Sequence, residues 1–418
     1  MNILVVGGGG REHAICAALA RSPRVNKLYC APGNGGIASV AECRPEIVAT
    51  DIPGVVHFAL DNAVDYVMVA PDDPLAAGMV DVLEDAGIRA FGPHGNAAII
   101  EASKVFSKNF MRKYGIPTAK FETFSVPEDA LAYIEAQGAP IVVKADGLAL
   151  GKGVVVAQTV AEAKAAITEI MVNEKFGHSG DEIVIEECLS GPEVTVLAFT
   201  DGTTIVPMLS SRDHKRVNDN DEGPNTGGMG AICPSPNYTP ELAAQCMETI
   251  FRPTIDAMRA EGREFRGVIY FGLMLTKNGP YVIEYNARFG DPETQPILEM
   301  LDTDLLDIFE AVTDGRLAEI DVKWKSGAAA CVVMASGGYP GDYAKGLEIH
   351  GLDAVPDGVT VYHAGTKLKD GAYHTSGGRV LGVTARGGNL AEAIANAYDG
   401  VKHISFDNAH YRTDIGKG

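Results

Sequence analysis

The sequence predicts a protein of several domains that combines the α/β and α+β classes. We expect an open parallel α/β sheet domain first, then a central core with a small lid subdomain, then a C-terminal α+β domain. Three observations lead to this prediction. Short apolar strands alternate with helices over about the first 100 residues, which is typical of a parallel sheet. Paired strands with tight-turn dipeptides fill the middle, and strand and glycine-turn patterning returns from Gly327 onward.

The N-terminal domain is predicted to span residues 1–103. Its first strand, at 3–6, leads through a glycine turn at 7–10 into a helix at 11–20. The pattern further predicts strands near 27–31, 46–49 and 66–70 and a helix at 74–86. Because the glycine turn follows the first strand, a potential anion site lies at the carboxyl end of the sheet.

The central domain is predicted at 104–325. Its first helix, at 103–114, ends at Gly115 and Pro117, since proline after a glycine cap cannot continue a helix. A compact α+β unit at about 120–190 follows, and its size suits a lid. This unit comprises predicted helices at 127–137 and 160–172 and strands at 141–145, 154–157 and 182–187.

Two hairpins follow the lid. The segment 194–200 turns at Asp201-Gly202, and 268–276 turns through Asn278-Gly279, dipeptides that tolerate tight turns. Between them lie a polar loop at 213–231 and a long helix at 239–259. The C-terminal domain is predicted at 326–418, with one late helix at 390–401.

Composition limits the classes of partner. The content of 46% apolar and 22% charged residues is ordinary for a soluble protein, and no run of about 18 uncharged apolar residues could span a bilayer. Seven scattered cysteines without a C-x-x-C pair, and no basic leader, favour the cytoplasm. A net charge of -20 opposes binding to nucleic acid or anionic membranes. No heptad repeat indicates an interface, so we expect a monomer.

The glycine cluster at 7–10 is similar to a dinucleotide fingerprint, but its spacing fails. The third glycine of G-x-G-x-x-G, counted from Gly7, falls on Glu12, and residues 28–32 contain no acid to hold a ribose. A dehydrogenase is therefore disfavoured. Two interpretations stay open: a phosphate-bearing substrate on the backbone of Gly9 and Gly10, or a purely structural turn.

The segment 144–153 holds two lysines around a glycine-rich loop between two strands. It is not a Walker A motif, because a glycine follows Lys152 and a strand follows the loop. Backbone amides at Gly147, Gly151 and Gly153 could cover phosphates, and Lys144 could supply a point charge. The alternative is a solvated hairpin with incidental lysines.

Acidic residues lie where the lid returns to the larger body. Glu186 and Glu187 end a predicted strand, and Glu193 follows it. A nucleotide lodged there could place its adenine at the hinge and its ribose hydroxyls on Glu193. Surface carboxylates without a function are the alternative.

The strand 281–286 is the most informative segment. Glu284 and Asn286 are two residues apart and share a face, which suits magnesium because that ion takes few protein ligands beside phosphate and water oxygens. Arg288 can grip a carboxylate or phosphate at two points. The charged, glycine-rich loop 213–231 is a second candidate, since such loops often carry function. A polar strand edge and a plain surface loop are the alternatives.

Taken in order, these segments resemble the glycinamide ribonucleotide synthetase family of ATP-grasp ligases over nearly the whole chain. The resemblance rests on GGGGREHA at 7–14, APGNGG at 31–36, KADGLALGKGV at 144–154, DHKR at 213–216, GPNTGGMGA at 223–231, EYNARFGDPETQ at 284–295, HAGTK at 363–367 and GGRV at 377–380. Asp72 departs from the glutamate that the family usually has. Tyr285 replaces a phenylalanine and leaves both predicted metal ligands intact.

The resemblance implies ligation of glycine to 5-phosphoribosylamine in de novo purine (IMP) biosynthesis. ATP would drive the reaction through glycyl phosphate and give N1-(5-phospho-D-ribosyl)glycinamide, ADP and phosphate. It implies that Lys104 and Lys144 bind the phosphates of ATP. The loop 147–153 would cover those phosphates, through Gly147, Gly151, Lys152 and Gly153. It implies adenosine at Glu186, Glu187 and Glu193, and Mg²⁺ or Mn²⁺ on Glu284 and Asn286. Catalytic roles are expected for Lys144, Asp213, Lys215 and Arg288, and substrate binding for Gly9, Gly10, Asp72, Asn225, Gly227, Arg288, Gly290 and Asp291.

Two rivals remain beside the dehydrogenase. Another ATP-grasp ligase could carboxylate an amine or join two amino acids, although the loops at 223–231 and 288–295 weigh against it. A nucleotide-binding regulatory protein without turnover would be expected to lack a metal ligand or a phosphate lysine. Lys144, Glu284 and Asn286 are all present.

Overall fold

A five-stranded parallel sheet forms the N-terminal part of the computed structural model, which describes residues 1–148 and 153–417. Its strand order is β3-β2-β1-β4-β5, so the order reverses beside β1. The carboxyl ends of the strands at such a reversal form the usual ligand crevice of an open α/β sheet. The strands are β1 (Asn2–Gly7), β2 (Lys27–Pro32), β3 (Glu42–Cys43), β4 (Tyr66–Val69) and β5 (Arg89–Phe91).

Helices flank this sheet, and the chain passes from β1 directly into α1 (Gly10–Ala20). Two sequence predictions for this part are wrong. The strand predicted at 46–49 is a turn, in which the Ile47 amide bonds to the Arg44 carbonyl, and the third strand lies earlier. The helix predicted at 74–86 is broken by Gly78, whose φ of +80° is not helical. The further helices are α2 (Ile52–Asp61), α3 (Asp72–Ala76), α4 (Met79–Asp85) and α5 (Gly95–Ala102).

The central body is built on a four-stranded antiparallel sheet with the order β11-β10-β16-β17. Both predicted hairpins are confirmed, and Gly202 adopts a φ of +90° in the first turn. The strands are β10 (Glu193–Asp201), β11 (Ile205–Pro207), β16 (Arg266–Thr276) and β17 (Gly279–Asn286). The helices of this part are α6 (Lys104–Tyr114), α9 (Pro240–Cys246), α10 (Arg252–Ala260), α11 (Thr294–Met300) and α12 (Leu305–Thr313).

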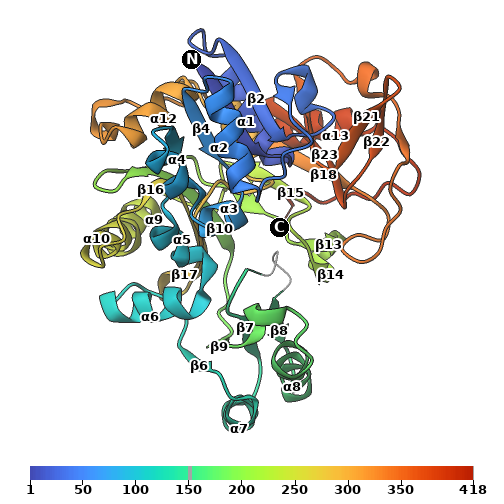
Figure 1. The fold of residues 1–418 in the computed structure, drawn as a ribbon. Helices are drawn as coiled ribbons and strands as arrows, with labels where there is room; N and C mark the ends of the chain where they lie inside the picture. Colours follow the sequence, from blue (N-terminus) through green and yellow to red (C-terminus); the bar gives the residue numbers. More distant parts are fainter. Residues whose placement is uncertain (149–152, 418) are drawn as a thin grey trace.

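A separate four-stranded sheet with the order β6-β9-β7-β8 lies at the end of the molecule away from the N-terminal sheet (Figure 1). Helices α7 (Pro127–Gln137) and α8 (Val160–Ile167) pack with this sheet around an apolar core of its own. The strands are β6 (Phe121–Phe124), β7 (Ile141–Ala145), β8 (Val154–Ala157) and β9 (Ile183–Glu187). The glycine-rich loop joins β7 to β8, and residues 149–152 of that loop lie outside the described part.

The C-terminal residues form a five-stranded sheet with the order β12-β15-β18-β23-β20, covered by α13 (Leu390–Val401). Two of its strands come from the segment predicted as a polar loop at 213–231, so that prediction is wrong in part. The strands are β12 (Arg212–Asp213), β15 (Gly230–Cys233), β18 (Ala328–Ala335), β20 (Val359–His363) and β23 (Arg379–Gly387). The same segment forms a hairpin of β13 (Arg216–Asn218) and β14 (Glu222–Asn225). A smaller sheet holds β19 (Glu348–Ile349), β22 (Ala372–Thr375) and β21 (Thr366–Lys369).

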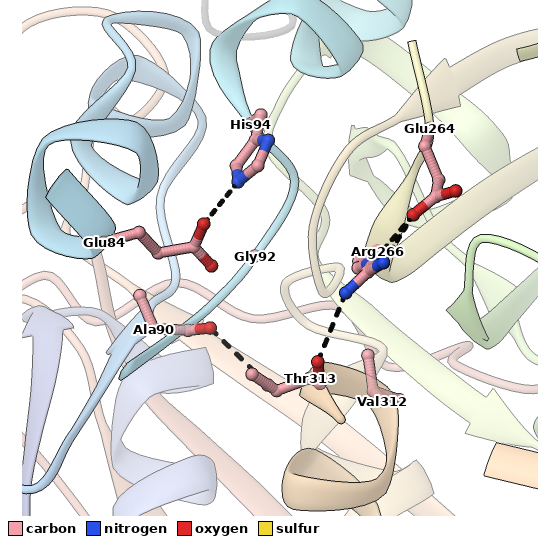
Figure 2. Close-up of a pocket in the computed structure, with 8 residues that line it drawn as sticks. All are labelled: Glu84, Ala90, Gly92, His94, Glu264, Arg266, Val312 and Thr313. Atoms are coloured by element: carbon pink, nitrogen blue, oxygen red, sulfur yellow. Dashed lines mark hydrogen bonds and ion pairs between the residues drawn. The ribbon is translucent and has the colours of Figure 1, made fainter. Parts of the chain in front are cut away.

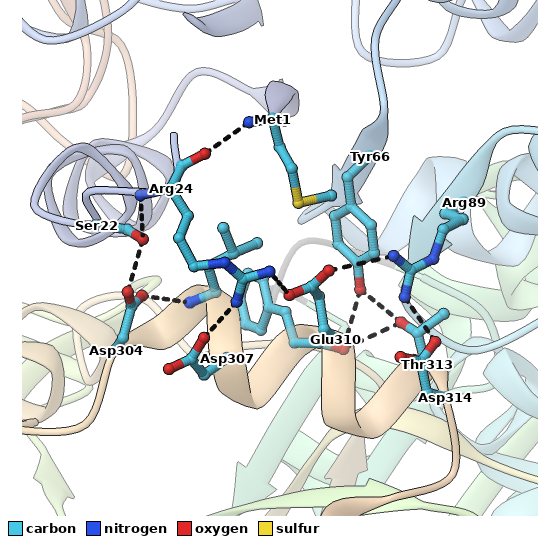
Figure 3. Close-up of polar contacts among 12 residues, drawn as sticks. Met1, Ser22, Arg24, Tyr66, Arg89, Asp304, Asp307, Glu310, Thr313 and Asp314 are labelled. Atoms are coloured by element: carbon cyan, nitrogen blue, oxygen red, sulfur yellow. Dashed lines mark hydrogen bonds and ion pairs between the residues drawn. The ribbon is translucent and has the colours of Figure 1, made fainter. Parts of the chain in front are cut away.

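Polar contacts fix the N-terminal sheet to α12 (Figure 3). Arg24 contacts Asp307 and Glu310, and Arg89 reaches Glu310 at 3.2 Å and Asp314 at 2.6 Å. Because Glu310 pairs with Arg24 from the loop after α1 and with Arg89 from β5, this helix and the sheet are held in a defined relation. No helix within residues 1–148 and 153–417 is long and apolar enough to cross a membrane.

Candidate active site

Glu284 on β17 is the centre of a cluster of lysines. Its Oε1 lies 3.2 Å from Nζ of Lys215, which also lies 3.1 Å from Oε2 of Glu193. The pKa of Glu284 is lowered to about 2, mainly by the charge of Lys215 and further by Lys144 and Lys104, although burial opposes this shift. The carboxylate is therefore ionised at neutral pH, which is the form that binds a metal cation.

Asn286 lies two residues further along β17, on the same face as Glu284. Its Oδ1 accepts a hydrogen bond of 3.3 Å from Nη2 of Arg288. Across the described residues, no group of three or more His, Cys, Asp and Glu side chains could hold a metal ion. A carboxylate and an amide oxygen fit Mg²⁺ or Mn²⁺ only if nucleotide phosphates and water complete the coordination, as is usual for magnesium.

Lys144 and Lys104 converge from the small sheet and from α6. Nζ of Lys144 lies 2.5 Å from Oε1 of Glu186 and donates to the carbonyl of Ile283 at 2.9 Å. Nζ of Lys104 donates to the carbonyl of Gly147 at 2.9 Å. Burial, and then the charge of Lys144, lower the pKa of Lys104. Two nearby ammonium groups next to the glycine-rich loop suit a polyphosphate, whose charge would stabilise both.

Glu186 is a structural carboxylate as well as a candidate adenosine contact. Its side chain is 3% exposed and also lies 2.7 Å from Nζ of Lys108, which donates to Oγ1 of Thr118. The two lysines lower the pKa of Glu186 against the opposing effect of burial, and burial lowers the pKa of Lys108 to about 8. The Glu186 carboxylate therefore faces Lys108 and Lys144. The Glu187 carboxylate accepts from the Lys120 amide at 2.9 Å.

Arg288 is held by a buried carboxylate that the sequence patterns did not reveal. Its Nη2 lies 2.7 Å from Oε1 of Glu101 and 3.9 Å from Oδ2 of Asp72. The other oxygen of Glu101 accepts from the Ala287 amide at 2.7 Å. Burial raises the pKa of Glu101 to about 7 in spite of the arginine. The guanidinium group is thus oriented where the N-terminal crevice meets the end of β17.

Asp291 joins three segments at the crevice. Its Oδ2 accepts from the Arg11 amide at 3.3 Å, and Nη2 of Arg379 lies 3.5 Å from the same oxygen. Nη1 of Arg379 also donates to the carbonyls of Asp291, at 2.6 Å, and Gly227, at 2.7 Å. Gly9 donates its amide to Oε2 of Glu12 at 2.6 Å, as a helix capping box does. The structure thus gives the Gly9 amide a partner within its own turn.

Asp213 and Glu293 are neighbouring carboxyl groups, of which Glu293 is buried and Asp213 is half-buried. Oδ1 of Asp213 has no hydrogen-bond partner in the part of the chain that the structure describes. Burial, followed by the charge of Glu293, raises the pKa of Asp213 well above its usual range. Glu293 accepts from the Tyr270 hydroxyl at 2.9 Å, and burial raises its pKa as well. The two neighbouring carboxyl groups therefore oppose each other's ionisation.

The remaining predicted residues lie around these groups. Gly227 donates its amide to the Tyr339 hydroxyl at 3.0 Å, and the carbonyl of Gly290 accepts from Oγ1 of Thr294 at 2.5 Å. A side chain on Gly10 would come within 2.6 Å of Nε2 of Gln295. Asn225 pairs with Arg216 in the β13–β14 hairpin, and the Gly153 carbonyl accepts from the Ala145 amide at 2.8 Å. Gly151 and Lys152 lie outside the described residues.

Sequence reasoning missed several residues of this cluster. Their partners are far away in the chain, so a local pattern gives little signal for them. Three of them, Arg11, Glu293 and Arg379, lie inside the quoted motifs, but no role was assigned to them. The missed residues are Arg11, Glu101, Lys108, Tyr270, Glu293 and Arg379.

A pocket between the β5–α5 connection, the start of β16 and the end of α12 is separate from these groups (Figure 2). His94 and Glu84 lie 2.7 Å apart on its wall, and Arg266 pairs with Glu264 at 2.7 Å. Its charged side chains are therefore partnered with each other.

The fold and the cluster of lysines around Glu284 define an enzyme of the ATP-grasp class, whose nucleotide is ATP. Residues 102–294 match the family model for the ATP-grasp (A) domain of phosphoribosylglycinamide synthetase. Residues 1–101 and 329–418 match the models for the N and C domains of the same protein. The chain therefore belongs to the phosphoribosylglycinamide synthetase family, whose function is phosphoribosylamine–glycine ligase activity in purine biosynthesis.

Relatives of full length support this conclusion. Phosphoribosylamine–glycine ligase of Nostoc sp. is 50% identical over 421 residues, covering 100% of this chain and 99% of the relative. The ligase of Caldanaerobacter subterraneus subsp. tengcongensis is 48% identical, with 100% of both chains covered. The crystal structure of the Thermotoga maritima ligase is 33% identical and has a TM-score of 0.87, covering 99% of this chain and 100% of that one. The predicted fold class and the family resemblance are thereby confirmed.

A more distant structure shares the fold alone. The biotin carboxylase domain of 2-oxoglutarate carboxylase from Hydrogenobacter thermophilus is 16% identical, with a TM-score of 0.74. It covers 98% of this chain and 91% of that one, and it was determined with magnesium ADP and bicarbonate.

Proposed function

We propose that this chain ligates glycine to 5-phosphoribosylamine and gives N1-(5-phospho-D-ribosyl)glycinamide, ADP and phosphate. The observation that carries the chemistry is the convergence of Lys104, Lys144 and Lys215 on the ionised Glu284. The full-length relatives named phosphoribosylamine–glycine ligase support the choice of substrates. This places the reaction in de novo purine (IMP) biosynthesis.

The reaction needs ATP because a free carboxylate is a poor acylating agent. Its oxygen leaves only after it has been converted into phosphate. Glycine would therefore attack the γ-phosphate to form glycyl phosphate and ADP. The amine of 5-phosphoribosylamine would then attack the glycyl carbonyl, and phosphate would leave. The protein contributes alignment and neutralisation of charge.

The nucleotide side of the site would use residues from three elements. Lys104 and Lys144 would hold the phosphates of ATP, with Gly147, Gly151, Lys152 and Gly153 over them. Glu193, and the segment with Glu186 and Glu187, would contact adenosine. Glu284 and Asn286 would bind Mg²⁺ or Mn²⁺, which would neutralise phosphate oxygens when bound.

The substrate side would lie between β17 and the N-terminal crevice. Arg288, oriented by Glu101, would bind a carboxylate or phosphate of a substrate. Glycine and the sugar phosphate would be surrounded by Lys215, Asn225, Gly227, Gly290 and Asp291. The residues at the crevice would be Gly9, Gly10 and Asp72. Asp213, whose Oδ1 has no hydrogen-bond partner among the described residues, would accept a hydrogen bond from the attacking amine.

The domain division proposed here is 1–103, 104–325 and 326–418, with a lid at about 120–190. Closure of that lid would exclude water from the acyl phosphate, which water would otherwise hydrolyse. We further propose that the protein acts as a monomer in the cytoplasm, with small molecules as its partners.

The test is ADP release by the purified protein with ATP and magnesium, with glycine and 5-phosphoribosylamine omitted in turn. Release should require both substrates and should be lost in Glu284→Gln, while Glu128→Gln on the exposed face of α7 keeps it. ADP release at background with both substrates present would reject these substrates. Release without the amine would indicate a ligase or kinase that uses a different acceptor.

A further inference from the structure

The hairpin of β13 and β14 carries residues of the site on an extended arm. Lys215 precedes its first strand and Asn225 ends its second. Thr226 ties the base of the hairpin, because its amide and its hydroxyl both donate to the Lys215 carbonyl at 2.8 Å. The tip is the turn Asp219–Asp221, none of whose residues is buried. The position of Lys215 therefore depends on what holds this arm.

The C-terminal segment (residues 410–417) holds the tip. Figure 1 shows the C-terminus beside β15 and close to the hairpin. Arg412 is 1% exposed and is among the largest fully buried side chains of the described residues. Its Nη1 donates to Oδ1 of Asp221 at 2.7 Å and to the carbonyl of Arg216 at 3.2 Å. Its Nε and Nη2 both bond to Asp414, at 2.7 and 2.8 Å.

Neighbours of Arg412 add contacts to the same turn. The Thr413 amide donates to Oδ1 of Asp219 at 2.8 Å, and its hydroxyl bonds to the other carboxylate oxygen. The Asn220 amide donates to Oδ2 of Asp414 at 2.8 Å. Asn220 and Asp221 have φ values of 59° and 54°. Residues other than glycine rarely keep this conformation unless their surroundings impose it.

The same segment also holds the base of the arm. His214 lies between Asp213 and Lys215, and its Nε2 accepts from the Gly416 amide at 3.0 Å. Its Nδ1 donates to the Gly230 carbonyl at 3.2 Å. Burial lowers the pKa of His214 to about 4, so the ring is neutral and can both accept and donate. The C-terminal segment therefore contacts both ends of the loop that carries the substrate-side residues.

We propose that Arg412 is a positioning residue of the ligase site: it fixes the β13–β14 hairpin so that Lys215 stays against Glu284. This inference rests on the proposed function. Arginine suits the task because its planar fork reaches two carboxylates and a carbonyl at once. Without it, the half-buried Asp414, the exposed Asp221 and the Arg216 carbonyl lose their shared donor, and a partly buried acceptor without a donor is costly.

The test compares Arg412→Ala and Arg412→Lys with Arg386→Met, a change of an exposed arginine on β23. In both Arg412 variants, kcat/KM for glycine and for the amine should fall by roughly 10- to 100-fold, as expected for a misplaced reacting group. The KM for ATP should change less than the KM values for glycine and the amine, because Lys104 and Lys144 lie on other elements. Millimolar methylguanidinium should restore part of the rate of Arg412→Ala and leave that of Arg412→Lys unchanged. Equal weakening of all three substrates, or no rescue, would overturn the proposal.

Hydrogen exchange separates this proposal from the proposed function. The amides of Thr226 and Met229 should exchange faster in Arg412→Ala than in the wild type, whether or not the protein proves to be a ligase. In Arg386→Met the two amides should exchange at the wild-type rate. Unchanged exchange would reject the positioning role even if the chain is the ligase. If Arg412→Ala does not fold, Asp221→Asn removes a single exposed partner, and it should give a smaller change in the same direction. A normal kcat/KM in that variant would then count against the proposal.

Discussion

The ammonium group of Lys215 lies between two carboxylates, 3.2 Å from Glu284 and 3.1 Å from Glu193. Lys215 lies between β12 and β13, Glu284 lies on β17, and Glu193 begins β10. The lysine therefore links the predicted substrate loop to the predicted metal strand and to the predicted adenosine contact.

The stability difference between the wild type and Glu284→Gln should depend on pH. The folded pKa of Glu284 is about 2, below the value of about 4.3 for an unfolded chain. Ionisation of Glu284 therefore stabilises the folded state above that unfolded value, and the contribution is lost as the pH falls towards 2. Urea unfolding at a series of pH values from about 5 to 3 should show the difference shrinking. A constant difference would mean that the lysines do not shift this group.

Lys108→Met should destabilise the protein by about 3 kcal/mol, because it removes one of the two ammonium groups that neutralise the buried Glu186. It should also raise the KM for ATP, since Glu186 would interact more strongly with Lys144. The control is Lys164→Met, whose partner Glu135 is exposed, and it should cost less than about 1 kcal/mol. Urea unfolding and steady-state kinetics measure both effects. Similar losses of stability in the two variants would show that the buried ion pair stabilises the protein no more than an exposed one.

Gly228→Ala should lower kcat by about 10-fold or more, because a misplaced catalytic group is costly. Its φ is +113°, and a Cβ would come within 2.6 Å of Oδ1 of Asp213 and 2.4 Å of Pro292. The matched control is Gly87→Ala, where φ is +78° but no atom lies within 4 Å of the added carbon. That variant should lose about 1 kcal/mol of stability through backbone strain and keep its kcat. Full activity in Gly228→Ala would remove Asp213 from the mechanism.

Glu310→Gln should lower the free energy of unfolding by about 1 to 3 kcal/mol, because two arginines share this half-buried carboxylate. The KM values should not change, since these contacts lie between α12 and the N-terminal sheet. Asp307→Asn is the control, because this exposed side chain pairs with Arg24 alone among the ion pairs of the described residues and should cost less than about 1 kcal/mol. Chemical unfolding of the three proteins decides between these values. Equal stabilities would assign the docking of the sheet to apolar packing instead.

Local patterns predicted the parts of the fold that local contacts determine. The parallel sheet and both hairpins followed from apolar periodicity and turn dipeptides, and the helix at Leu390–Val401 has the predicted bounds. The segment at 213–231 was predicted as a loop because its strands are short and their partners are remote. Gly230, for example, pairs with Val332 on β18. A local sequence pattern cannot indicate the pairing of two strands that are about 100 residues apart in the chain.

The same distinction holds for the site. Glu284 and Asn286 were placed on one face because the side chains of a strand alternate. The contacts of Arg288 with Glu101 and of Lys144 with Glu186 depend on tertiary packing, and no spacing in the sequence indicates them. The role of each site residue stays a prediction for the experiments above to test.

The pairing of β15 with β18 has a consequence for the order in which the chain becomes functional during synthesis. When the ribosome has released the first 325 residues, every residue assigned to ATP and to the metal has already emerged. The strand β15 still lacks its neighbour, and the tip of the β13–β14 hairpin still lacks Arg412. Because domains fold as units during translation, a nascent chain could hold the nucleotide before it could align the amine. On the proposed role of Arg412, the substrate side of the site would form only after residues 410–414 have left the ribosome.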